Sequence, residues 1–365
     1  MYLKRISLTN FRNHSETNLE FKSRLIFFIG NNGEGKTNVL ESISLLSYLK
    51  SFRESDENQL LMWDSPFTFV KAEFEAGNED YLFEFGIQNG PISKRKKIKI
   101  NGELVKRISD SVGFFRSVIL SPPDIKIIEA GNIERRKYID AFISSTNSGY
   151  LNHLIEYNHI LKQRNSALKK DNATEKEIEI WNAPLIEREA EISKERKRTI
   201  DQLSEYFYKN LISLSQGKDQ FQIAYKPNVS NKEEHLEKLK RNLRKDLAIG
   251  YTSCGNHRDD IPIGFEDKDL SHFGSQGQKR SAVIALKTAG FQMIRDQTGE
   301  APVLLIDDII RELDVKRREY FVNLISECGQ VFFTTTDLEG IKEYIGSKDL
   351  DREIFEVRDG KVTKV

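Results

Sequence analysis

The chain of 365 residues contains only 2 cysteines and 8 prolines, and it has no net charge. Cys254 and Cys328 lie far apart and form no CxxC pattern, which excludes a disulfide framework and a cysteine-rich zinc site. No apolar run reaches about 18 residues and no apolar leader block follows the first residue, so neither a membrane span nor a secretion signal is predicted. These absences predict a cytoplasmic protein in a reducing compartment.

The balance of 56 basic and 56 acidic side chains gives no global attraction to a polyanion. Any nucleic-acid surface must therefore come from local clusters of positive charge. Charged residues make up 31% of the chain, which indicates long solvated surfaces around a folded core. At roughly 100–200 residues per domain, the length predicts about two domains.

Periodicity divides the chain into three regions. Alternation and apolar runs predict strands at 2–9 and 24–29, a helix from Lys36, and an antiparallel meander over 67–100. Residues 132–214 are charged, proline-poor and helix-periodic, which predicts a helical arm with a turn or kink near Pro184. By composition alone this arm is a charged helical subdomain without a function of its own. Strands at 303–306 and 331–334, separated by a helical stretch, indicate a return to α/β structure after about residue 245.

Residues 30–37 fit the pattern GxxxxGK[ST] between an apolar strand and a helix start. Glycines allow the backbone N–H groups to surround phosphate oxygens, Lys36 neutralises β/γ charge, and the Thr37 hydroxyl is suited to Mg²⁺. The strand–loop–helix context makes this the most specific signal in the chain. The predicted nucleotide contacts are Gly30, Asn31, Asn32, Gly33, Gly35, Lys36, Thr37 and Asn38.

An apolar strand, 303–306, ends in two carboxylates. Beside a phosphate loop, Asp307 is predicted to hold the metal and Asp308 to act as general base on the attacking water. Without that loop, the same residues indicate no more than a strand ending in a polar turn.

The segment 274–280 (GSQGQKR) precedes another helix-periodic run. A helix N-terminus with Ser and Gly favours an anion, so Ser275, Gly277 and Gln278 are predicted to close on the γ-phosphate held by Lys36 of a second copy. Read in isolation, the segment predicts only a capped helix.

The order of these motifs resembles the ABC-type ATPase heads of SMC-like repair proteins, and most closely the bacterial RecF family. The resemblance includes 8–13 (LTNFRN), 51–53 (SFR), 121–124 (SPPD), 135–140 (RRKYID), 257–260 (HRDD), 312–314 (ELD) and 334–337 (TTTD). It implies an α/β, ABC-type P-loop head with an antiparallel β-subdomain, built from 1–120 and 246–365, and a mainly helical arm domain, 121–245. Arg311, Asn256 and Pro184 depart from the usual family pattern.

The same resemblance implies a weak, DNA-stimulated ATPase that needs Mg²⁺. It implies ATP-dependent homodimerisation on double-stranded or gapped DNA, and cooperation with RecR and RecO in loading recombinase. Arg12 matches a position near the nucleotide, and Ser275 matches the signature serine that acts in trans.

DNA contacts are less readable. Residues 94–107 contain seven basic side chains and one acidic side chain. This local charge predicts a phosphate-binding patch or, as the alternative, a solvated hairpin. Arg135 and Arg136 are a second candidate, with ion pairing inside the arm as the alternative. The DNA-binding candidates are Lys94, Arg95, Lys96, Lys97, Arg135 and Arg136.

Two other functions share much of this pattern. A transporter ATPase subunit has a similar phosphate loop, signature and Asp-rich strand, although the long charged insertion and the absence of a switch histidine after 331–333 argue against it. A nucleotide-dependent binding module that barely hydrolyses ATP also remains open, because Asp308 stands where related ATPases commonly have glutamate.

Overall fold

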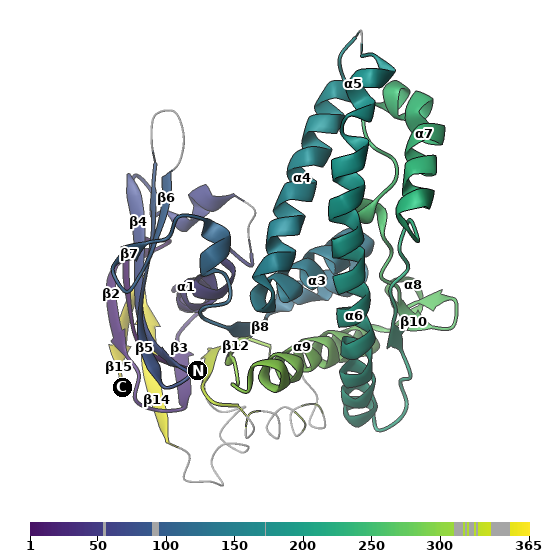
Figure 1. Ribbon diagram of the computed structural model, residues 1–365. Helices are drawn as coiled ribbons and strands as arrows, with labels where there is room; N and C mark the ends of the chain where they lie inside the picture. The colour runs from purple at the N-terminus through teal and green to yellow at the C-terminus, as the bar shows by residue number, and fades with distance from the viewer. Residues whose placement is uncertain are drawn as a thin grey trace. The chain divides into compact units, whose positions relative to one another are not determined.

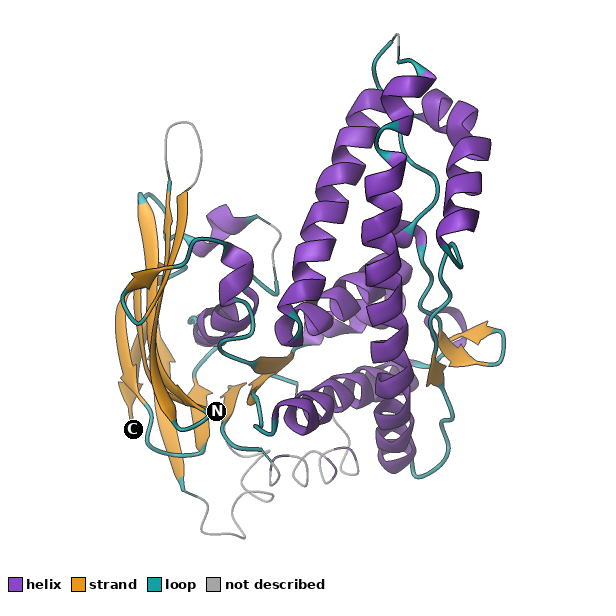
Figure 2. Cartoon of the chain, in the orientation of Figure 1, coloured by secondary structure: helices purple, strands orange, loops and turns teal. Residues whose placement is uncertain are grey.

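The computed structural model describes residues 1–53, 56–89, 95–171, 173–309, 317, 320, 325, 328–336 and 351–365, apart from the side chain of Arg95. The predicted helical stretch between the strands at 303 and 331, including 311–314, lies largely outside these residues, as does Asp337. Figures 1 and 2 show the chain by position and by secondary structure.

The chain divides into two compact units, which are described separately. Unit 1 comprises 1–125, 209–219 and 280–365, and unit 2 comprises 126–208 and 220–279. This differs from the predicted division, which began the arm at 121, kept 209–219 in it and returned 246–279 to the head. The reason is a set of ion pairs that join 246–279 to the arm helices: Asp246 to Arg164 and Asp259 to Arg196.

The first sheet of unit 1 is the predicted antiparallel meander, with strand order β2-β1-β4-β5-β6-β7. Buried and partly buried side chains alternate along β4, as expected for a sheet with one face against a core. Leu3, Ile6, Phe74 and Phe83 are fully or almost fully buried in that core. Its strands are β1 (Tyr2–Phe11), β2 (His14–Glu20), β4 (Phe67–Ala76), β5 (Glu79–Gln88), β6 (Arg95–Ile100) and β7 (Glu103–Leu104).

The second sheet of unit 1 is mostly parallel, with order β15-β14-β3-β13-β12-β8. Its inner strands are almost continuously apolar because parallel strands are buried on both faces. The strand β3 lies between β14 and β13, so the turn after Ile29 is at the middle of the sheet edge. The strands are β3 (Leu25–Ile29), β8 (Ser117–Leu120), β12 (Val303–Asp307), β13 (Val331–Thr335), β14 (Arg352–Arg358) and β15 (Lys361–Lys364).

Helix α1 (Lys36–Tyr48) starts at the predicted residue and follows β3 directly. It is buried along most of its length, with Val39, Leu40 and Ile43 in the core of unit 1. Its C-cap residue Leu49 adopts a left-handed conformation. Helix α9 (Gln276–Thr298) begins in unit 2 and continues into unit 1.

Unit 2 is the predicted helical arm (Figure 2). The predicted break near Pro184 is confirmed between α5 and α6, because Pro184 lies in the first turn of α6, where its missing N–H is not needed. The remainder of α6 is continuous and extends into unit 1. The helices are α2 (Lys126–Glu129), α3 (Asn132–Thr146), α4 (Ser148–Leu168), α5 (Glu175–Glu179), α6 (Asn182–Ser215), α7 (Lys232–Ile249) and α8 (Leu270–Phe273), with β9 (Gln222–Ile223), β10 (Ile263–Phe265) and β11 (Lys268–Asp269) forming a small sheet.

Buried arginines hold unit 2 together. Arg196 donates to Asp140 at 2.8–2.9 Å and to Asp259 at 2.7 Å, while Arg164 pairs with Asp246 at 3.0 Å. Such pairs leave a buried charge uncompensated when one partner is removed. Among the described residues, no helix is both long and apolar enough to cross a bilayer.

Candidate nucleotide site

The glycines of the 30–37 loop are required by its backbone. Gly30 has φ +154°, and a Cβ there would lie 2.3 Å from the carbonyl oxygen of Val357. Gly35 has φ +111°, and its Cβ would lie 2.7 Å from the amide group of Asn13. A side chain at either position would therefore displace a neighbouring strand or the turn after β1.

Lys36 is buried, and its ammonium is held by the loop itself. Nζ donates to the carbonyl oxygens of Gly30 at 2.7 Å and Asn31 at 2.8 Å. The loop tip, Asn31 to Gly33, is exposed to solvent. This arrangement presents one positive charge beneath a ring of backbone groups, which is the chemistry of a phosphate site.

Asp307 joins the end of β12 to the start of α1. Its Oδ1 accepts from the Thr37 hydroxyl and from the Thr334 hydroxyl, both at 2.7 Å. Burial raises the pKa of this carboxyl, while the two hydroxyl hydrogen bonds act in the opposite direction. Two hard oxygen ligands of this kind, Thr37 Oγ1 and Asp307, suit Mg²⁺.

Asp308 has an unusual backbone and an unsatisfied side chain. Its φ is +49°, in the left-handed region that non-glycine residues rarely adopt. Its N–H donates to the Thr334 hydroxyl at 3.1 Å, and its Oδ1 is buried without a hydrogen-bond partner among the described residues. Strain and an open acceptor at the edge of the parallel sheet are typical of a functional site.

Side-chain amides connect the loop to neighbouring segments. Asn38, a predicted nucleotide contact, donates to Asn13 at 2.7 Å and accepts from Arg53 at 3.0 Å. Asn13 in turn donates to the carbonyl oxygen of Glu34 at 3.0 Å. The chain of amides fixes the side of the loop that faces the end of β1.

Arg12 was predicted beside the nucleotide, but its guanidinium is engaged by another residue. Nε and Nη2 donate to the two carboxylate oxygens of Glu41 at 2.8 and 2.7 Å. Glu41 is fully buried in α1 and also accepts from the Ser51 hydroxyl. Sequence reasoning missed Glu41, although one carboxylate among the apolar positions of α1 was the available signal.

We expect Glu41→Gln to lower the free energy of unfolding of unit 1 by about 2–4 kcal/mol, because a buried charge-assisted pair loses one charge. Urea unfolding followed by pulsed hydrogen exchange at the backbone amides of α1, a helix of unit 1, measures this loss. Glu16→Gln, an exposed change of the same kind, serves as control and should stay within about 0.5 kcal/mol of the parent. Equal stability of the two variants would contradict the structural importance of the Arg12–Glu41 pair.

The signature residues lie in unit 2, at the start of α9. Ser275 and Gln278 form a reciprocal pair in which Ser275 N donates to Gln278 Oε1 at 2.9 Å and Gln278 N donates to Ser275 Oγ at 3.3 Å. Gly277 lies between them. The capped helix predicted for this segment is present, and Ser275 and Gln276 are exposed, while the predicted contact with a second copy's γ-phosphate stays a prediction.

The predicted DNA contacts receive uneven support. Arg135 is 2% exposed and is bound by Asp269 and by backbone carbonyls, so its guanidinium is not available to phosphate. Arg136 donates to the Asp259 carbonyl and is half-buried. The alternative of ion pairing inside the arm therefore applies to Arg135.

The basic hairpin is also partly engaged. Lys96 is bound by Glu57 at 2.5 Å and by the Leu49 carbonyl at 3.0 Å, which removes it from the predicted patch. Lys97 is exposed, so a role in phosphate binding stays a prediction. Lys94 and the side chain of Arg95 lie outside the described residues.

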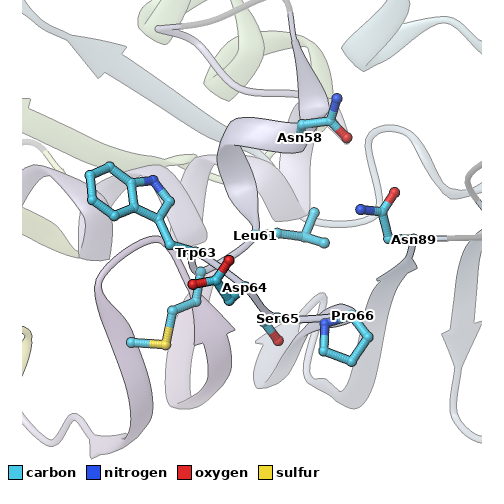
Figure 3. Close-up of a pocket in the computed structure, with 8 residues that line it drawn as sticks. Asn58, Leu61, Trp63, Asp64, Ser65, Pro66 and Asn89 are labelled. Carbon is cyan, nitrogen blue, oxygen red and sulfur yellow. The ribbon is translucent and has the colours of Figure 1, made fainter.

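A pocket of about 650 Å³ opens near the end of β1 (Figure 3). Trp63, which is 94% exposed, projects from its wall, and the backbone N–H of Met62 donates to the Asn10 carbonyl at 2.9 Å. Asn58, Asn89 and Ser65 supply neutral polar groups. Among the described residues that line this pocket, Asp64 alone is charged, so the lining does not suit a polyphosphate.

A family model described as the RecF/RecN/SMC N terminal domain matches residues 2–355. The chain is 69% identical to the DNA replication and repair protein RecF of Leptospira biflexa serovar Patoc, over 99% of this chain and 98% of that protein. The chain belongs to the RecF family. RecF of Leptospira interrogans serogroup Icterohaemorrhagiae serovar copenhageni is 51% identical over the full length of both chains.

Solved structures agree with this membership in the RecF family and its ABC-type ATPase fold. One solved structure is that of the recombination mediator protein RecF with ATP, in the RecFOR pathway. It has a TM-score of 0.91 and 34% identity to this chain, and the match covers 100% of this chain and 97% of that one. A Pyrococcus furiosus Smc head domain has a TM-score of 0.54 at 18% identity, covering 100% of this chain and 96% of that one, and so shares the fold. The predicted family and fold class are confirmed.

Proposed function

We propose that the chain is an ATP-dependent, DNA-binding recombination mediator in DNA repair and replication-fork maintenance. ATP binding assembles a homodimer on double-stranded or gapped DNA, and slow, DNA-stimulated hydrolysis releases it. The single observation that carries this proposal is the convergence of Lys36, the Thr37–Asp307 pair and Asp308 at one edge of the parallel sheet. The ATP-bound RecF structure, at 34% identity, supports ATP as the nucleotide.

Each residue has a distinct task in this mechanism. The N–H groups of the 30–37 loop and the Lys36 ammonium bind the β- and γ-phosphates, and Thr37 with Asp307 would hold Mg²⁺. When bound, Mg²⁺ neutralises phosphate charge. Asp308 orients the attacking water and accepts its proton through the carboxylate, whose Oδ1 is otherwise unpartnered among the described residues.

A second copy supplies the remaining contacts. Ser275 and Gly277, at the N-terminus of α9, bind the γ-phosphate held by the partner's loop, because the positive end of the helix dipole favours an anion. ATP thereby joins the two copies. Hydrolysis removes the γ-phosphate that both copies contact, so the free energy that favours the dimer is lost.

The partners follow from this role. Duplex or gapped DNA is the nucleic acid that the dimer binds. The RecFOR pathway named for the solved relatives supports cooperation with RecO and RecR in loading recombinase. Work on the bacterial chromosome implies a cytoplasmic location.

We expect the wild-type chain to sediment as a dimer with Mg-ATP, and to be retained on a gapped duplex. Lys36→Arg should remain monomeric under both conditions, because a planar guanidinium cannot replace an ammonium held by two loop carbonyls. Sedimentation velocity with and without nucleotide and DNA measures both properties. A wild-type chain that stays monomeric and ignores DNA would overturn the proposal.

A further inference from the structure

The strongest unassigned surface is a set of four basic side chains on α7, in unit 2. Lys240, Arg241, Arg244 and Lys245 are all exposed, and none forms an ion pair with another described residue. Their spacing of i, i+1, i+4 and i+5 places them on one side of the helix. We call this the α7 basic face.

The opposite side of α7 is firmly anchored. His235, Leu239, Leu243 and Asp246 are buried, with Leu243 packed in a cluster that includes Leu168 and Ile178 of α4 and α5. Asp246 also pairs with Arg164 inside unit 2. The basic side chains therefore project from a helix that is already ordered, so little backbone conformational entropy is lost when a ligand binds.

Helix stability does not explain this concentration of charge. Positive side chains favour a helix C-terminus only within the last turn, and the last turn of α7 contains none. The acidic residues of α7, apart from buried Asp246, all precede Lys238: they are Glu233, Glu234 and Glu237. Glu237 lies one turn before Lys240 and Arg241, yet it makes no ion pair with either of these described residues. The four basic side chains therefore repel one another, and a ligand that neutralises them is a physical reason to place them together.

The ligand that fits is a polyanionic backbone. Lys240 and Lys245 are separated by about 7.5 Å along the helix axis, and duplex DNA carries a charge about every 1.7 Å of its own axis. Several phosphates can therefore be contacted at once. None of the four side chains of the α7 basic face is aromatic, so they offer charge to phosphates and no stacking surface to bases, which favours contacts without sequence preference.

We propose that the α7 basic face binds the phosphate backbone of duplex DNA. This inference rests on the proposed function, because it assigns part of the DNA surface that the mediator needs. It replaces the arm candidate Arg135, which is buried, with residues that the sequence analysis did not single out.

The test compares charge reversal with a matched control. Arg241→Glu/Arg244→Glu is expected to weaken binding to a fluorescent gapped duplex at least 10-fold in Mg-ATP. The negative slope of log K against log salt should become shallower by about 2 between roughly 50 and 200 mM salt, because two phosphate contacts are lost. Lys218→Glu/Lys268→Glu, at two other exposed lysines, makes the same change in net charge and should change affinity less than 3-fold.

Two further measurements distinguish the loss of a charged surface from other effects of the substitutions. Arg241→Lys/Arg244→Lys should bind DNA within about 3-fold of wild type, since the contacts require charge and not a guanidinium fork. ATP-dependent dimerisation of the Glu variant, measured by sedimentation, should be unchanged, which separates loss of a surface from loss of the fold.

Wild-type affinity and slope in the Glu variant, or an equal loss in the control, would overturn the α7 proposal while leaving the mediator function intact. A wild-type chain with no ATP-dependent retention on DNA would overturn both.

Discussion

Asp308→Asn is expected to reduce ATP turnover by about 10²–10⁴-fold while leaving nucleotide affinity nearly unchanged. In the proposed mechanism the Asp308 carboxylate accepts the proton of the attacking water, and an amide cannot do so. Asparagine tolerates the left-handed backbone found at this position, φ +49°, so the turn after β12 is preserved. Phosphate release in single-turnover conditions measures the loss, and sedimentation should show a dimer that outlasts that of the wild type.

Asp64→Asn is the matched control. Asp64 also has a left-handed backbone, φ +59°, but it is exposed in the pocket beside Trp63 and should have wild-type turnover. If Asp308→Asn hydrolyses ATP as fast as this control, Asp308 is not the base. Negligible turnover by the wild-type chain itself would instead favour the nucleotide-dependent binding module.

Arg196→Ala should destabilise unit 2 by about 3–5 kcal/mol. The substitution removes a buried guanidinium that binds Asp140 and Asp259 and also donates to the Asn256 carbonyl at 2.8 Å. Burial alone works against this charged group, but the neighbouring carboxylates raise the pKa of Arg196 well above its usual range. Without the arginine, Asp259 remains fully buried with its counter-charge lost.

The two tryptophans, Trp63 and Trp181, allow this loss to be measured in one unit. In a Trp63→Phe background, the fluorescence of Trp181 reports urea unfolding of unit 2 alone. Arg198→Ala is the control, since Arg198 is exposed and pairs only along its own helix with Glu195. Its expected cost is within about 0.5 kcal/mol, and a cost for Arg196→Ala as small as this would contradict the importance of the buried pairs.

The parts that could be predicted from the sequence are those with a local cause. Alternation along 67–76 predicts a half-buried strand, and an apolar strand followed by glycines and Lys36 predicts the strand–loop–helix that the structure contains. Pro184 likewise marks a helix start because its effect acts within one turn. Asp307 lies beside Thr37 because the strands of a parallel sheet end at the same edge, and its role as a metal ligand stays a prediction.

The parts that could not be predicted depend on pairs distant in sequence. Arg12 and Glu41 are separated by 29 positions, and nothing local indicates that they form a buried bidentate pair. The membership of 246–279 in unit 2 depends on Asp246 and Asp259 finding arginines in α4 and α6. The buried state of Arg135 similarly requires Asp269, which is 134 positions away.

The order of strands in the parallel sheet also governs when the nucleotide site can form during synthesis. The strand that carries the phosphate loop, β3, pairs with β13 and β14, which are translated more than 300 residues later. At about 5–20 residues per second, β3 emerges from the ribosome roughly 15–60 s before its neighbours. A nascent or prematurely terminated chain therefore has the glycine-rich loop without the sheet that shapes it. ATP affinity becomes a property of the finished molecule, which keeps incomplete copies from competing for nucleotide or capturing a complete partner.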